Sequence, residues 1–234
     1  MIENLPEYVS ITFILTTFLT VGFLLYAVKQ SVFETVPAKI LIFLLSFWIF
    51  FQAILARSGF FQNNEAFPPR IAVFAIAPAL LLIAAYFIFF RRNFIEKLPL
   101  KLLTLLSIIR IPVEIVLMWL FHNQMVPQAM TFEGRNFDIL SGISAPLVYL
   151  LAFRGGRVNR PLLIAWNLAA LGLLLNVVVT AVLAFPALNP QLAIELQNRA
   201  VGYFPFIWLP AVVVPIVLFT HLASLWKLFK NAPN

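Results

Sequence analysis

Residues 102–121, "LLTLLSIIRIPVEIVLMWLF", decide the fold class of this chain. The stretch has the length of a membrane-spanning helix, which needs about 20 largely apolar residues, yet it carries Arg110 and Glu114 in its middle. Each such charge costs about 2.5–3.5 kcal/mol at the centre of a bilayer on insertion scales. At 3.6 residues per turn, Thr104, Ser107, Arg110 and Glu114 share one face. We therefore expect a membrane helix whose polar face points into a helix bundle.

The composition of the whole chain agrees with this interpretation. Of its 234 residues, 62% are apolar and only 11% are charged, whereas soluble domains carry roughly 25% charged residues. The sequence therefore predicts an all-α, polytopic membrane protein, a bundle of seven transmembrane helices in a single domain covering residues 1–234. The predicted spans are residues 9–28, 40–56, 71–90, 102–121, 137–153, 162–185 and 205–226.

The distribution of basic residues predicts the orientation of the bundle. Eleven of the 16 Lys and Arg residues fall in the loops after odd-numbered spans and in the C-terminal tail, and four fall in the loops after even-numbered spans. Cytoplasmic loops carry the excess of Lys and Arg. We therefore expect the N-terminus outside and the C-terminus in the cytoplasm.

Several polar residues within the spans form a candidate ligand-binding site. Arg110 and Glu114 lie at a depth similar to that of Gln52, Asn176 and Thr16 on other spans. We expect Arg110 to bind an anionic or carbonyl group, with Glu114 as counter-ion or proton acceptor and the amides as hydrogen-bonding walls. The alternative is structural, because Arg and Glu four residues apart can neutralise one another and amides can join helices.

The segment 131–139, "TFEGRNFDI", is the densest polar cluster outside the spans. We interpret it, with the preceding histidine, as a vestibule over the site. Alternatively it is a turn at Gly134 followed by a helix cap, since Asn and Asp are favoured at helix N-termini. The candidate vestibule residues are His122, Glu133, Arg135, Asn136 and Asp138.

The sequence gives little support for other chemistry. It contains no cysteine and only two histidines, predicted at opposite ends of their spans, and the patterns of zinc-peptidase and nucleotide-binding motifs are missing. No activated nucleophile or pair of catalytic carboxylates stands out. We therefore expect no catalytic residues, no metal ligands, no cofactor and no nucleic-acid partner.

Three segments carry a resemblance to other proteins: "RIPVE" (110–114), "TFEGRNFDIL" (131–140) and "YFPFIWLPAVVVPIVLFTHL" (203–222). Through them the chain resembles a group of uncharacterised bacterial seven-helix integral membrane proteins of the Bacteroidota type. The resemblance implies a multi-pass protein of the bacterial cytoplasmic (inner) membrane, and it implies no activity.

Two hypotheses of function follow from the sequence. In the first, an outward-leaning intramembrane pocket binds or translocates a small ligand, ion or proton, as a transporter or a ligand-binding protein would. In the second, the chain is a scaffold or assembly subunit of a membrane complex, and its buried charges are structural. The expected partners are membrane lipids, an unidentified small ligand or ion, and either further copies of the chain or another membrane protein.

Overall fold

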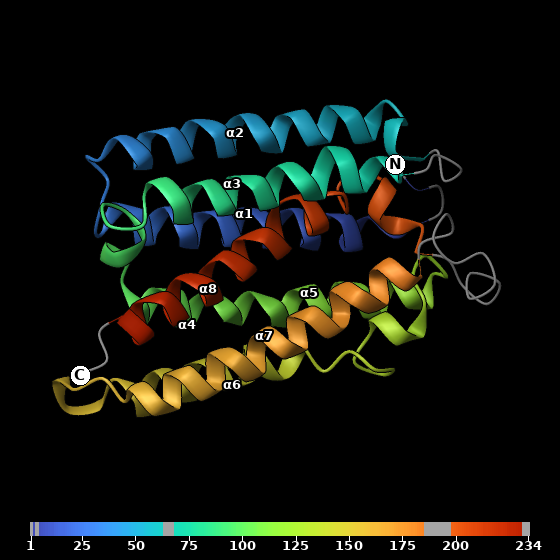
Figure 1. Ribbon diagram of the computed structural model, residues 1–234. Helices are drawn as coiled ribbons and strands as arrows, with labels where there is room; N and C mark the ends of the chain where they lie inside the picture. The colour runs from blue at the N-terminus through green and yellow to red at the C-terminus, as the bar shows by residue number, and fades with distance from the viewer. Residues whose placement is uncertain (1, 3–4, 63–67, 185–197, 231–234) are drawn as a thin grey trace.

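The computed structural model describes residues 2, 5–62, 68–184 and 198–230, and it is helical (Figure 1). Within these residues there is no β-strand, so the all-α prediction is confirmed. The α-helices are α1 (Glu7–Lys29), α2 (Val36–Arg57), α3 (Ala77–Phe89), α4 (Leu100–Leu106), α5 (Arg110–His122), α6 (Ile139–Ala152), α7 (Arg160–Leu183) and α8 (Val214–Lys230).

Short segments of other helix types extend two of these helices and join two others. The π-helix η2 (Ala72–Ile76) leads into α3, and the π-helix η9 (Leu209–Val213) leads into α8. The 3₁₀ helix η4 (Ser107–Ile109) joins α4 to α5, so that Leu100–His122 forms one helical stretch. Prolines inside or just after such stretches disturb regular α-helical bonding.

Each of the seven predicted spans overlaps a helical stretch, and their ends differ by up to four residues. Residue 185, the last of the sixth predicted span, lies outside the described part of the chain. Six described helical stretches are long and apolar enough to cross a membrane, and α6, with 14 residues, is a shorter apolar helix. The fold is therefore compatible with a multi-pass membrane protein.

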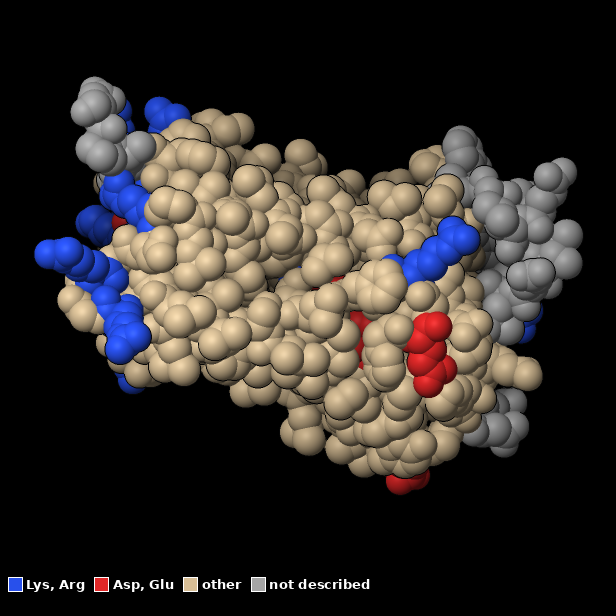
Figure 2. All heavy atoms as spheres, turned by 90° about the horizontal axis from the view of Figure 1, so that it is seen from below, with Lys and Arg blue, Asp and Glu red and all other residues tan. Residues whose placement is uncertain are grey.

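The bundle has two outer pairs of helices with α8 between them (Figure 1). Helices α2 and α3 lie on one side, α6 and α7 on the other, and α8 crosses obliquely from one end of the bundle to the other. The two termini lie at opposite ends, and Lys and Arg side chains gather at the end that holds the C-terminus (Figures 1 and 2).

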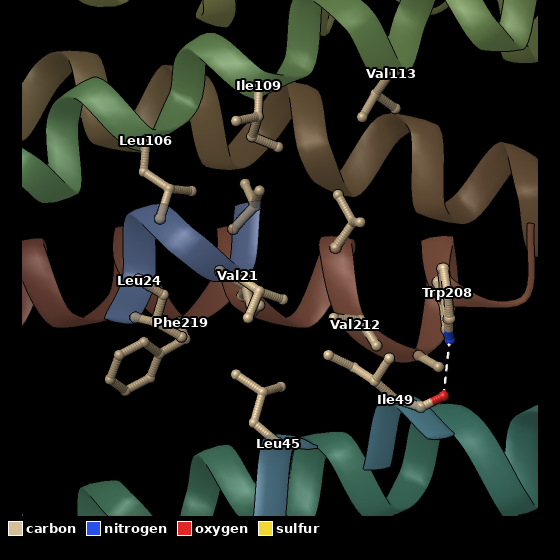
Figure 3. Close-up of a cluster of buried hydrophobic side chains, with 14 of the residues drawn as sticks. Val21, Leu24, Leu45, Ile49, Leu106, Ile109, Val113, Trp208, Val212 and Phe219 are labelled. Atoms are coloured by element: carbon tan, nitrogen blue, oxygen red, sulfur yellow. Dashed lines mark hydrogen bonds between the residues drawn. The ribbon is translucent and has the colours of Figure 1, made fainter. Parts of the chain in front are cut away.

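The apolar core joins α1, α2, α4, α5 and α8. Val21, Leu45, Ile109 and Val212 are all buried and converge in one cluster (Figure 3). Trp208, just before η9, also packs there, and its indole Nε1 donates a hydrogen bond to a backbone carbonyl of α2 at 3.0 Å. Burial of each large apolar side chain contributes about 1.5–3 kcal/mol when the reference is an aqueous surface.

Gln52 of α2 joins α2 to the helical stretch that contains η2. Pro78 has no N–H to donate to the Phe74 carbonyl, which lies four residues earlier. The Gln52 Nε2 atom donates to this carbonyl at 2.8 Å, and the Gln52 side chain is fully buried. A side chain of a neighbouring helix thus supplies the donor that the proline lacks.

Trp48, one turn before Gln52 on the same face of α2, does the same for α8. Pro215 cannot donate to the Ala211 carbonyl, and the Trp48 indole Nε1 donates to that oxygen at 2.9 Å. Helix α2 therefore supplies hydrogen-bond donors to two neighbouring helices at their proline sites.

An ion pair joins the last turn of α8 to the loop before α4, which contains the short helix η3 (Ile95–Lys97). Lys230 Nζ lies 2.6 Å from Glu96 Oε2, and Lys227 donates to the Leu98 carbonyl. The hydrogen bond from Lys230 holds the pKa of the Glu96 carboxyl below its ordinary value of 4.5.

Candidate functional site

Arg110, the first residue of α5, is buried with 2% of its surface exposed. Its Nη1 atom donates to Asp138 Oδ1 at 2.6 Å and to the Ala170 carbonyl at 3.1 Å, and Nη2 lies 2.9 Å from His221 Nε2. One guanidinium group thereby connects α5 with the N-cap residue of α6, with α7 and with α8.

The arrangement around His221 fixes the protonation of its ring. A guanidinium group can only donate hydrogen bonds, so Nε2 of His221 must accept and the ring proton lies on Nδ1. Nδ1 is 2.8 Å from Asn167 Oδ1, and Asn167 Nδ2 donates to the Leu163 carbonyl at 2.8 Å. His221 is therefore a neutral link between Arg110 and Asn167 of α7.

Glu114 lies one turn after Arg110 and is bound by the segment before α6. Its Oε1 atom accepts a hydrogen bond from Asn136 Nδ2 at 2.6 Å, and the same amide nitrogen donates to the Met130 carbonyl at 2.9 Å. Asn136 Oδ1 in turn accepts from the backbone N–H of Asp138 at 3.0 Å. Asn136 therefore links Glu114 to Asp138.

This geometry corrects the role predicted for Glu114. The ion-pair partner of Arg110 is Asp138, which the sequence analysis placed in a vestibule, at 2.6 Å. The contacts of Asn136 and Asp138 agree in part with the predicted helix cap, and no contact tests the predicted vestibule. Asn136 makes a cap-like bond to the backbone before α6, whereas the carboxylate of Asp138, the N-cap residue, is bound by Arg110.

The close approach of α6 to η4 brings the two parts of the network together. A Cβ atom added to Gly142 of α6 would lie 2.8 Å from Ile111 Cγ1 and 3.2 Å from the Ser107 carbonyl. Only glycine permits this contact. The start of α6, which holds Asp138, is thereby kept against Arg110.

Several polar atoms of this region keep open hydrogen-bonding positions. Among the described residues, Arg110 Nε, Glu114 Oε2 and Asn198 Oδ1 are buried atoms without a hydrogen-bond partner. The hydroxyl oxygens of Ser107 and Ser141 are also buried without a hydrogen-bond partner among the described residues. Buried polar groups are nearly always paired in proteins, and an unpaired one costs about 1–3 kcal/mol. The presence of several unpaired buried atoms around Arg110 therefore makes this region a candidate binding site.

A cavity of about 310 Å³ lies next to this network, between η2 and α3, α5, α7, and η9 and α8. This volume is at the lower end of the range of about 300–1,000 Å³ for small-molecule sites. Most of its walls are Val, Leu and Ile side chains. The polar residues that line it, which we call the polar floor, are Arg110, Glu114, Asp138 and Asn198.

The cavity opens on the side of the bundle. Its lining includes Leu80 of α3 and Leu175 and Val182 of α7, whose side chains are 43%, 50% and 41% exposed. We call these three residues the mouth. Along its middle, the face that includes α6 and α7 is mainly uncharged, with a small area of acidic side chain recessed between other residues, and charged side chains stand out nearer its two ends (Figure 2).

The other residues predicted to bind a ligand lie outside the cavity walls. Gln52 pairs with the carbonyl described above, and its Oε1 atom also has no partner among the described residues. Thr16 donates its hydroxyl to the Thr12 carbonyl of its own helix at 2.8 Å. Asn176 is exposed and its Nδ2 atom donates to the Arg135 carbonyl at 2.8 Å. The structure does not bring these three side chains to Arg110.

The predicted vestibule divides into a buried and an exposed part. Asn136 and Asp138 belong to the buried network, whereas His122, Glu133 and Arg135 are exposed. His122 Nε2 lies 3.5 Å from Glu133 Oε2. His122, Glu133 and Arg135 thus lie on the surface and take no part in the buried network.

Three residues of the site were missed by the sequence analysis: His221, Asn167 and Asn198. His221 and Asn167 carry a signal, since each is a polar residue within a long apolar stretch. Asn198 lies in a polar loop, where the sequence does not distinguish it. Within the described ranges, no group of three or more His, Asp or Glu side chains is placed to hold a metal ion.

Fold and site together define an all-α bundle of apolar helices with a buried charged network beside a lateral cavity. A family model with the description "Domain of unknown function (DUF8737)" matches residues 66–229, and the chain belongs to this family. The matched range contains every residue of the network and leaves out α1 and α2. No curated protein matches the chain. No solved structure matches it either.

Proposed function

We propose that the protein is a seven-helix protein of the bacterial cytoplasmic membrane that binds a small ligand in the cavity between α3, α5, α7 and α8. In this proposal the N-terminus lies outside and the C-terminus in the cytoplasm. The apolar helices and the gathering of Lys and Arg side chains at the end with the C-terminus support this orientation (Figure 2).

One observation carries the proposal of ligand binding. Glu114 Oε2, Arg110 Nε and Asn198 Oδ1 are buried and unpaired among the described residues, and all three residues line the same cavity. An unpaired atom alone is a weak sign, as Gln52 Oε1 demonstrates, but Gln52 lies away from this cavity. A ligand head with complementary groups would satisfy the polar floor and recover the cost of burying it.

The geometry favours binding over translocation of an ion. Arg110 is held by partners from α6, α7 and α8 at 2.6 to 3.1 Å, and the cavity walls are apolar. An ion path would need polar groups along its length, because desolvation of an ion is costly. The polar residues that line the cavity all belong to the polar floor, so no row of polar groups continues from it along the cavity wall.

A thermal-shift screen of the protein in lipid nanodiscs, with water-soluble and lipid-soluble compounds, tests the proposal. Glu114→Gln replaces the carboxyl group that carries an unpaired oxygen at the floor, and Glu133→Gln makes the same chemical change at an exposed side chain as a matched control. A ligand should raise the Tm of wild type and of Glu133→Gln, and raise that of Glu114→Gln much less.

An equal rise of the Tm in a folded Glu114→Gln variant would refute the assignment of the site. If, in addition, the same membrane protein co-purified with the chain in every preparation, the scaffold or assembly function would become the better explanation. In that case the charged network would serve only to stabilise the bundle.

A further inference from the structure

We infer that the ligand of this cavity is an amphiphile of the lipid phase, with an apolar body and a non-anionic head that donates a hydrogen bond to Glu114. This inference rests on the proposed ligand-binding function and specifies the chemical class of the ligand. It also specifies the route of entry, which is lateral, between α3 and α7.

The lateral route follows from the position and the chemistry of the mouth. Leu80 and Leu175 are both cavity-lining and 43% and 50% exposed, so the cavity reaches the side of the bundle at these residues. In the proposed orientation this side faces lipid. A hydrated ligand would lose its water on passing an apolar mouth, whereas a lipid-borne molecule would exchange one apolar surrounding for another.

The hydrogen-bonding capacity of the polar floor specifies the head of the ligand. Nη1 of Arg110 uses both of its N–H groups and Nη2 uses one of its two, which leaves Nε and the second N–H of Nη2 as donors. Glu114 Oε2 and Asn198 Oδ1 are the open acceptors. These two acceptors match a head that carries O–H or N–H groups, such as an alcohol or an amine.

The floor offers no free positive charge to an anionic head. The single guanidinium of Arg110 is already paired with Asp138 at 2.6 Å. An anion at the floor would therefore lose its water without gaining a cation of its own. The sequence-based expectation that Arg110 binds an anionic group is thus replaced by a donor head bound to Glu114.

Photolabelling in phosphatidylcholine nanodiscs tests this inference. A dodecyl chain carrying a diazirine is prepared with an alcohol, an amine, a carboxylate or a methyl ester head, and labelled peptides are identified by mass spectrometry. The alcohol or the amine should label the cavity-lining parts of α7 and α8, and an excess of the same unreactive compound should displace it. The carboxylate and the ester should label these parts about tenfold less, since their heads have no O–H or N–H group to donate to Glu114.

Two pairs of variants test separately how the head of the ligand is bound and by which route the ligand enters. Glu114→Gln should reduce labelling about tenfold, and Asn198→Leu provides a second change at the floor if the first variant does not fold. Leu175→Trp should obstruct the mouth. Leu168→Trp is its matched control, because Leu168 lies two turns earlier on the same face of α7, is also 50% exposed, and lies outside the cavity.

Each contrary result has a distinct meaning. Equal labelling by all heads, unchanged by the floor variants, would overturn the inference. So would equal labelling of Leu175→Trp and Leu168→Trp, or preferential labelling by the carboxylate. If the thermal-shift screen still found a water-soluble ligand that depends on Glu114, the proposed function would stand and only the inferred ligand class would be wrong. Without any such ligand, both would fail.

Discussion

Polar side chains that join helices are used differently in two regions of this bundle. On α2, Trp48 and Gln52 are neutral, and each donates to a backbone carbonyl that a proline leaves without its helical donor. Around Arg110, charged and neutral groups from four elements form one network, and atoms of this network remain unpaired beside a cavity. The comparison indicates that the donors of α2 complete two proline sites, although Trp48 also lines a second cavity. The charged network, in contrast, leaves several unpaired atoms on residues that line one cavity.

The largest loss of stability is expected from breaking the ion pair between Arg110 and Asp138. Arg110→Leu leaves Asp138 buried without its partner and removes the donor to His221. Breaking a buried ion pair from one side costs about 3–5 kcal/mol. We expect the free energy of unfolding, measured by denaturant titration in detergent micelles, to fall by about this amount.

The double variant Arg110→Leu with Asp138→Leu is the control for this prediction. Removal of both charges should recover a large part of the lost free energy, because the remaining groups no longer include an uncompensated carboxylate at that place. If the single variant were as stable as wild type, the network would not be the stabilising link between α5, α6 and α8 that the geometry indicates.

A smaller effect is expected at the contact that positions the network. Gly142→Ala places a methyl group 2.8 Å from Ile111 Cγ1 of α5 and 3.2 Å from the Ser107 carbonyl of η4, so α6 must move away from both. Overpacking of this kind costs about 1–3 kcal/mol, and the movement should also weaken ligand-induced stabilisation because Asp138 lies at the start of α6. The melting temperature and the ligand response are the measurements.

Gly172→Ala of α7 is a matched control for that change. A Cβ atom at Gly172 meets no described atom within 4 Å, so the substitution should leave stability unchanged or raise it through the better helix propensity of alanine. Equal destabilisation by the two substitutions would show that the cause is not the contact with η4.

A smaller loss of stability still is expected from a change at Gln52 of α2, and its size should depend on Pro78. Gln52→Leu removes the donor to the Phe74 carbonyl, and hydrogen bonds between membrane helices contribute about 0.6 kcal/mol on average and about 1.7 at most. In the background of Pro78→Ala, where the helix regains its own donor, the same change should cost less. A double-mutant cycle measures this coupling.

An additive cycle would contradict the pairing of Gln52 with the proline site. Ligand-induced stabilisation should remain unchanged in Gln52→Leu, since this side chain lies outside the cavity. That result would sharpen the contrast with Glu114→Gln, where the ligand response should be lost.

The helices could be predicted from the sequence because apolar runs of membrane length have few other structures. The polar face of residues 102–121 could be predicted because Arg110 and Glu114 are one helical turn apart. Both side chains are buried, as expected for a face that points into the bundle. Helical periodicity does not reveal local irregularity, so the 3₁₀ turn at Ser107–Ile109 and the two π-helices were not predicted.

The membership of the site could be predicted only in part, because depth in a bundle does not specify direction. Counting residues from the ends of a span placed Gln52 and Asn176 level with Glu114, but they face a proline site and the exterior, respectively. His221 was set aside because it lies nearer the other end of its helix. The long side chain of Arg110 reaches it nevertheless, at 2.9 Å. Only the packing of helices decides such contacts.

The smallest predicted effect concerns an ion pair at the surface, which offers a comparison with the buried one. Lys230 and Glu96 lie 2.6 Å apart, and their side chains are 48% and 23% exposed. The bond from Lys230 lowers the pKa of Glu96 below 4.5 in the folded protein. A lowered folded-state pKa means that the stabilisation is complete above about pH 4.5 and is lost as the pH falls through the lowered value.

The difference in unfolding free energy between wild type and Glu96→Gln should therefore be constant near neutral pH and shrink in acid. Added salt should reduce it as well, since exposed pairs are screened. At neutral pH, added salt should reduce the cost of Arg110→Leu less, because that network is shielded from the solvent. A salt dependence of the same size at both places would mean that water reaches Arg110, and it would contradict the contrast between a buried charged network and an ordinary surface ion pair.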